Sequence, residues 1–132
     1  MDMKIYFPGG KKVYADFNGF THKTDQQARG GGEGSAPAPF DLFLASMGTC
    51  AGIYVLGFCQ QRNINAEGME LKQSLSVNPA TGLVDRVHIQ INLPADFPEK
   101  YADALIRVAQ LCAVKRHLEN PPEFKITTRI KN

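Results

Sequence analysis

The stretch PFDLFLASMGTCAGIYVLGFCQQ, residues 39–61, decides the fold of this chain. Its apolar residues fall on nearly every side of a 3.6-residue helix, and a helix with so little polar surface has to be surrounded by protein. Three glycines each weaken such a helix by about 1 kcal/mol relative to alanine, yet they let neighbouring elements approach closely. Pro39 suits the first position of a helix, where its missing N–H costs nothing. The pattern predicts a central, buried helix over residues 40–61.

Segments of alternating apolar and polar residues lie on both sides of this helix, as is typical of strands with one face on a core. The predicted strands are residues 3–7, 12–18, 20–24, 69–77, 83–93 and 124–130. Residues 20–24 are either a third strand or a continuation of the second. Residues 99–118 read as an amphipathic helix that ends at Asn120-Pro121-Pro122. The order, roughly β-β-α-β-β-α-β, predicts a two-layer α+β domain with antiparallel pairing.

Residues 26–39 form a Gly/Pro-rich loop that reads as a flexible connection. The loop does not end in the Gly-Lys-Ser/Thr of a phosphate-binding loop, and its glycines miss the spacing of a dinucleotide site. A chain of 132 residues predicts a single domain, residues 1–132.

The charge and hydropathy of the sequence indicate which partners the protein can bind and where in the cell it is expected. The net charge is +2, without a long basic block, so no nucleic-acid partner is expected. The first residues lack the apolar core of a signal peptide, which predicts a cytoplasmic protein. Asp41, Ser46 and Thr49 interrupt the long apolar stretch, which favours a buried helix over a membrane span.

Three cysteines are expected to be free thiols in a reducing compartment. Cys50 and Cys112 both fall in the middle of predicted helices, and cations follow Cys112 closely, which favours its thiolate. Cys59 lies nine residues after Cys50, about 180° around the helix, and reads as a small core residue. The cysteines form no CxxC pair, and with His22, His88 and His117 they match no ligand signature, so no metal or other cofactor is expected.

Taken alone, each cysteine is most simply a small apolar core residue. Two segments of the sequence, one around each of Cys50 and Cys112, indicate a more specific role for these cysteines. The run from Pro39 through Cys50 resembles the pattern of the OsmC/Ohr family, in which a Pro, acidic positions, a Leu-rich run and small residues precede a cysteine. Cys112-Ala113-Val114-Lys115-Arg116-His117-Leu118 resembles the second segment of that family, Cys-Pro-Val followed by a basic stretch and Leu.

This resemblance implies a fold, an assembly and an activity. The fold is an intertwined homodimer with the central helices buried inside. The activity is reduction of apolar organic hydroperoxides, in which Cys50 attacks the peroxide, Cys112 resolves the product to a disulfide, and an external dithiol resets the pair.

The sequence departs from active members of the family in the groups that favour the thiolate. Phe40 stands where a Glu follows the proline, and the nearest acid is Asp41. The basic candidates for the early Arg of the family are Lys11, Lys12 and Arg29. These departures keep a second interpretation open: a protein of OsmC-like fold that binds a small molecule or responds to redox state with little peroxidase turnover.

Overall fold

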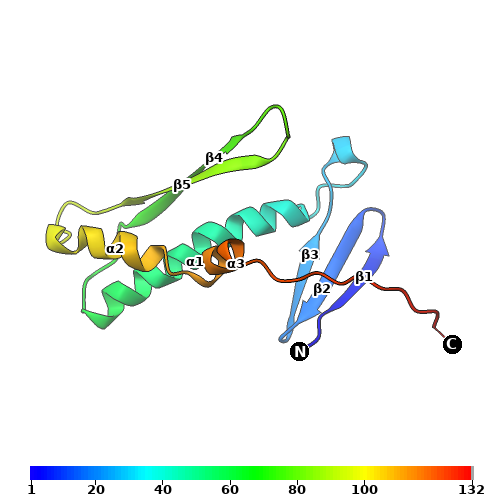
Figure 1. The fold of residues 1–132 in the computed structure, drawn as a ribbon, viewed down its shortest axis with the longest axis horizontal. Helices are drawn as coiled ribbons and strands as arrows, with labels where there is room; N and C mark the ends of the chain where they lie inside the picture. Colours follow the sequence, from blue (N-terminus) through cyan, green and yellow to red (C-terminus); the bar gives the residue numbers. More distant parts are fainter. Residues whose placement is uncertain (132) are drawn as a thin grey trace. The chain divides into compact units, whose positions relative to one another are not determined.

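Helix α1, Pro39–Gln61, follows the predicted central helix closely and begins at the proline. The computed structural model describes residues 1–131, and the chain divides into two compact units, Met1–Ser46 and a second unit that begins at Met47. Helix α1 starts in the first unit and continues into the second (Figure 1). The architecture is a mixed α/β fold with three α-helices and two small antiparallel sheets in the described residues.

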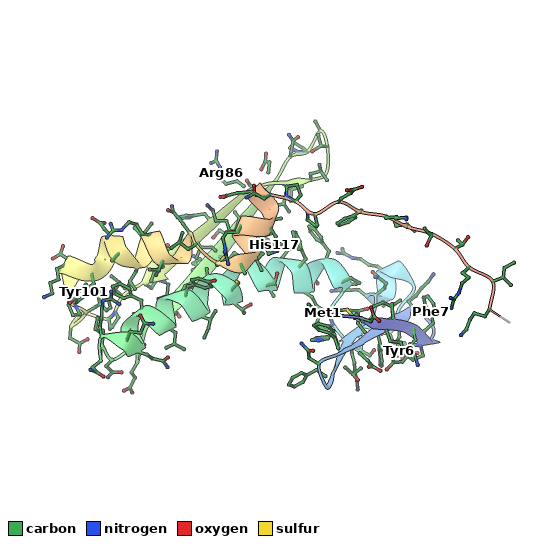
Figure 2. The ribbon with its side chains drawn as sticks, turned by 60° about the horizontal axis from the view of Figure 1, so that its bottom comes forward. Met1, Tyr6, Phe7, Arg86, Tyr101 and His117 are labelled. Carbon is green, nitrogen blue, oxygen red and sulfur yellow. The ribbon has the colours of Figure 1, made fainter. Side chains whose placement is uncertain are left out.

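The first unit contains a three-stranded sheet in the order β1-β2-β3, with strands Lys4–Gly9, Lys12–Phe17 and Phe20–Thr24. Both pairings are antiparallel, so residues 20–24 are a separate third strand. Tyr6, labelled in Figure 2, pairs with Tyr14 across the sheet, and their rings meet edge to face at 5.9 Å. Cross-strand aromatic pairs of this kind stabilise a small sheet.

The loop between β3 and α1 is folded around a buried carboxylate. Asp25 is 1% exposed and accepts hydrogen bonds from the backbone N–H of Gln26 at 2.7 Å and from the N–H and hydroxyl of Ser35 at 3.0 and 2.6 Å. A short 3₁₀ helix, Ala28–Gly30, lies within the loop. The composition predicted a flexible connection, but the side chain of Asp25 supplies the acceptors that the turning backbone needs.

The second unit packs α1 against a hairpin and a second helix. Strands β4, Glu70–Val77, and β5, Val84–Asn92, pair antiparallel and match the predicted second hairpin. Helix α2, Ala102–Ala109, lies along the second half of α1 (Figure 1). The core residues of this unit, buried between these elements, are Val55, Phe58, Cys59 and Leu105. Tyr101, labelled in Figure 2, precedes α2 and adds an edge-to-face contact with Phe58 at 5.7 Å.

Two predicted elements differ from the structure. The helix predicted over residues 99–118 is divided into a 3₁₀ turn, Glu99–Tyr101, then α2, then α3, Ala113–Glu119. The strand predicted over residues 124–130 is absent: this segment has no regular structure, and Phe124, Ile126 and Ile130 are exposed. A strand needs a neighbour to accept its backbone hydrogen bonds, and the described chain provides none for this segment. The observed order is therefore β-β-β-α-β-β-α-α.

Helix α1 is less completely covered than its sequence predicted. Its buried residues form one stripe, Ala51, Val55, Phe58 and Cys59, whereas Ile53 and Leu56 are exposed in the single chain. By length and composition alone, α1 could also cross a membrane. This is weak evidence for a membrane span, because core helices of soluble proteins pass the same test.

Candidate functional site

Cys50 lies at the edge of the exposed side of α1, about 180° from Cys59 but only about 100° from Ala51 in the buried stripe. It is two residues after Gly48, about 200° further around the helix, and three residues before the exposed Ile53. The thiol is free and half-buried, whereas Cys59 and Cys112 are buried. Of the three cysteines, Cys50 is therefore the one that a dissolved molecule reaches most easily.

Cys112 caps the start of a helix, which corrects the prediction that it lies within one. Its backbone is extended, with φ −61° and ψ 148°, and its Sγ accepts a hydrogen bond from the N–H of Lys115 at 3.4 Å. The thiol acts as the N-cap of α3 and is 3% exposed. A side chain that bonds the free N–H groups of a first turn stabilises a helix start at that position, so the chain begins a new helix here.

The family pattern contained the signal for this break. In the Cys-Pro-Val segment, proline directly follows the cysteine, and proline is favoured at the first position of a helix but not in its interior. In this chain, Ala113 occupies that first position, and alanine gives no such indication. Helical periodicity alone therefore predicted one helix where the structure has two, α2 and α3.

Cys59 is a core residue, as its position opposite Cys50 predicted. It is fully buried among Val55, Phe58 and Leu105. Burial raises the pKa of the Cys59 thiol, while Arg62 partly offsets this effect. A buried thiol with a raised pKa is a poor nucleophile, because the thiolate is the reactive form.

The supporting residues suggested by the sequence lie in the first unit. Asp41 is exposed in the first turn of α1, nine residues before Cys50, which places it about 180° from Cys50 on this unbroken helix. Lys12 forms an ion pair with Glu33 at 2.9 Å, and this hydrogen bond raises the pKa of Lys12. Arg29 is exposed in the 3₁₀ helix, and the aliphatic part of Lys11 lies beside Gly31.

Metal ligands do not gather in the part of the chain that the structure describes, where no group of three or more His, Cys, Asp and Glu side chains could hold an ion. His117, for example, is engaged with its own helix, with Nδ1 at 2.6 Å from the carbonyl oxygen of Ala113.

Gln73, on strand β4, lies against the turn of α1 that carries Cys50, and it was not among the site residues predicted from the sequence. A β-carbon built on Gly48 would lie 2.7 Å from Oε1 of Gln73, so the glycine is what allows the amide to approach α1. Its signal is visible in the sequence: Gln73 interrupts the apolar series Leu71, Leu75 and Val77, which otherwise alternates along β4.

Comparisons with known proteins agree with the fold and with the family resemblance of the sequence. The family model described as OsmC-like protein matches residues 32–127. The chain therefore belongs to the OsmC-like family. A search of curated proteins found no match.

Solved structures share the fold at low sequence identity. A protein of Psychrobacter arcticus 273-4, described in terms of osmotic stress and detoxification, superposes with a TM-score of 0.72 at 21% identity, over 86% of this chain and 85% of its own. An organic hydroperoxide resistance protein OsmC of Legionella pneumophila gives 0.52 at 20% identity, over 89% of each chain. The organic hydroperoxide resistance protein OhrB of Bacillus subtilis gives 0.53 at 18% identity, over 92% of this chain and 93% of its own.

Proposed function

We propose that this protein reduces organic hydroperoxides through two thiols, with Cys50 as the attacking and Cys112 as the resolving residue. The observation that carries the proposal is the contrast between these cysteines within one compact unit. Cys50 is partly open on the outer face of α1, whereas Cys112 is buried at the start of α3. Family relatives described as organic hydroperoxide resistance proteins support the choice of substrate.

The proposed chemistry proceeds in three steps. The Cys50 thiolate attacks one oxygen of the peroxide, the O–O bond breaks, and the alkoxide takes up a proton and leaves as an alcohol. The resulting Cys50 sulfenic acid is attacked by the Cys112 thiolate, which forms a disulfide and releases water. An external dithiol then reduces this disulfide by two exchange steps and becomes oxidised itself. Two electrons thus pass from the dithiol to the peroxide in each cycle.

The proposed working form is a homodimer, because Cys50 shares its helix face with exposed apolar residues. Ile53 is 58% exposed in the single chain, and Leu56 is also exposed. Soluble proteins seldom leave large apolar faces in water, and such faces mark interaction sites. A second copy over this face would place Cys50 in an apolar, water-poor setting suited to an alkyl hydroperoxide.

The activity is tested by mixing purified protein with an organic hydroperoxide and a dithiol and following peroxide consumption. The proposal expects turnover that prefers the organic hydroperoxide to hydrogen peroxide. Cys50→Ser should abolish consumption, and Cys112→Ser should allow Cys50 to react once without cycling. Cys59→Ala serves as the matched thiol control and should retain turnover. Unchanged turnover in Cys50→Ser would contradict the assignment.

The second candidate function is binding of an apolar small molecule with little turnover. It is favoured by the placement of the residues that were expected to promote the Cys50 thiolate. Lys12 is paired with Glu33, and Asp41 lies on the opposite side of α1 from Cys50. Background rates of peroxide consumption, combined with stoichiometric binding of an apolar ligand, would select this function over the peroxidase.

A further inference from the structure

Gln73 is a polar residue on the apolar face of strand β4. The register of the hairpin places Leu71 opposite Ile91, Gln73 opposite Ile89, and Leu75 opposite Val87, all on one face. Gln73 is the polar member of this otherwise apolar set, and its Oε1 atom is buried. Burying an amide costs free energy unless its polar atoms are engaged, so Gln73 places a demand on its surroundings that an apolar residue would not.

The amide of Gln73 lies against α1 at a glycine. A β-carbon on Gly48 would be 2.7 Å from Oε1 of Gln73, closer than such atoms can approach without displacement. One turn further along the same face, a β-carbon on Gly52 would be 4.0 Å from Cδ2 of Leu71, which is an ordinary contact. Two neighbouring inward side chains of β4 thus face two glycines of α1, but only at Gly48 does the observed approach require a glycine.

The position of Gly48 determines the position of Cys50. The two residues belong to one turn of a continuous helix and are separated by about 3 Å along its axis. Since a helix turn moves as a rigid element, a shift of the backbone at Gly48 is carried directly to the Cys50 thiol on the other side. Misplacement of a reacting group by about 1 Å can reduce a rate by about a hundredfold.

We propose that Gln73 is a positioning residue for Cys50: its amide, seated against Gly48, sets the orientation of the helix turn that presents the thiol. The inference rests on the proposed function only in taking Cys50 as the reacting thiol.

The first test displaces the amide in two ways. Gly48→Ala inserts a methyl group where Oε1 of Gln73 lies, and Gln73→Met replaces the amide with an apolar chain of similar length. Both variants are expected to slow oxidation of Cys50 by an organic hydroperoxide at least fivefold, measured by mass spectrometry of the Cys50 peptide. Alkylation of Cys50 by iodoacetamide should change by less than about twofold, because the thiol stays accessible. Gly52→Ala is the matched control and should oxidise at the wild-type rate.

The second test uses a charge to measure how strongly the Gln73 position acts on the Cys50 thiol through the intervening helix turn. Gln73→Glu retains the shape and one acceptor oxygen but adds a negative charge on the opposite side of the turn from Cys50. Repulsion across a partly buried turn should move the pH midpoint of Cys50 alkylation upward by about one unit. Gln90→Glu places the same charge on the outer face of the hairpin, where Gln90 is exposed, and should leave the midpoint unchanged.

The outcomes separate this inference from the proposed function. If wild-type Cys50 is oxidised by hydroperoxides only once and without catalytic turnover, the proposed function fails, while slower oxidation of Cys50 in Gly48→Ala and Gln73→Met still supports the positioning role. If Gly48→Ala and Gln73→Met oxidise Cys50 at the wild-type rate, or Gln73→Glu leaves the alkylation midpoint unchanged, the positioning role is overturned.

Discussion

A single carboxylate organises the loop that leads into α1. The hydroxyl and N–H of Ser35 and the N–H of Gln26 hydrogen-bond to Asp25 and lower its pKa from 3.8 to about 2, although burial acts in the opposite direction. The loop also needs Gly32, because a β-carbon there would collide with the carbonyl oxygen of Gln26. The composition of the loop gave no indication of this arrangement, since it depends on one acid meeting a serine ten residues later.

The depressed pKa of Asp25 predicts a specific pH dependence of stability. Because the folded pKa is below the unfolded value of 3.8, Asp25 stabilises the folded state above about pH 4, and this contribution is lost as the pH falls through about 2. Asp25→Asn should therefore lower the free energy of unfolding at pH 6 and flatten its decline between pH 4 and 2. Urea unfolding across this range measures the effect. Asp41→Asn is the exposed control, and equal curves for the wild type and Asp25→Asn would contradict the account.

The helices and strands show what periodicity in a sequence can and cannot predict. Helix α1, both hairpins and the membership of Cys59 in the core followed from residue patterns, because those patterns record which face is buried. The break at Cys112 did not follow, because the stripe of apolar residues continues across it and only a local cap interrupts the helix. The close approach of Gln73 to Gly48 also depends on tertiary packing, although an amide among leucines was visible beforehand.

The cap at Cys112 predicts how α3 responds to substitution. Cys112→Ala removes the acceptor for the N–H of Lys115 and should destabilise α3 at the lower end of the range of about 0.5 to 2 kcal/mol known for oxygen caps, because sulfur is a weaker acceptor, whereas Cys112→Ser retains a capping oxygen. Amide hydrogen exchange at Lys115 should therefore accelerate in the alanine variant and remain slow in the serine variant. Equal exchange in both variants would show that the sulfur does not stabilise the helix start.

At the scale of the whole molecule, the single chain leaves apolar surface that it does not cover. Large apolar side chains are exposed on α1, on the β4–β5 hairpin and along the last residues of the chain, and examples are Ile53, Val77, Phe124, Ile126 and Ile130. The segment predicted as a final strand is among them, and it still has the alternation that a strand requires. Its prediction failed for the isolated chain because strand formation depends on a neighbouring strand as well as on local sequence.

The proposed homodimer would cover this surface and can be tested by substitution. Ile53→Lys would be harmless on a solvated helix face but would bury a charge at a dimer interface. Sedimentation equilibrium at micromolar concentration should therefore give twice the chain mass for the wild type and a large shift to monomer for Ile53→Lys. Glu67→Lys, in an exposed loop, is the control for charge. A monomeric wild type would rule out the proposed assembly.

The most direct test of the two-thiol account is to map the cysteines after one equivalent of organic hydroperoxide is added to the reduced protein. The account predicts a disulfide between Cys50 and Cys112 within one chain, an unmodified Cys59, and release of one equivalent of alcohol. Recovery of Cys50 and Cys112 as free thiols, with the hydroperoxide unconsumed, would contradict it.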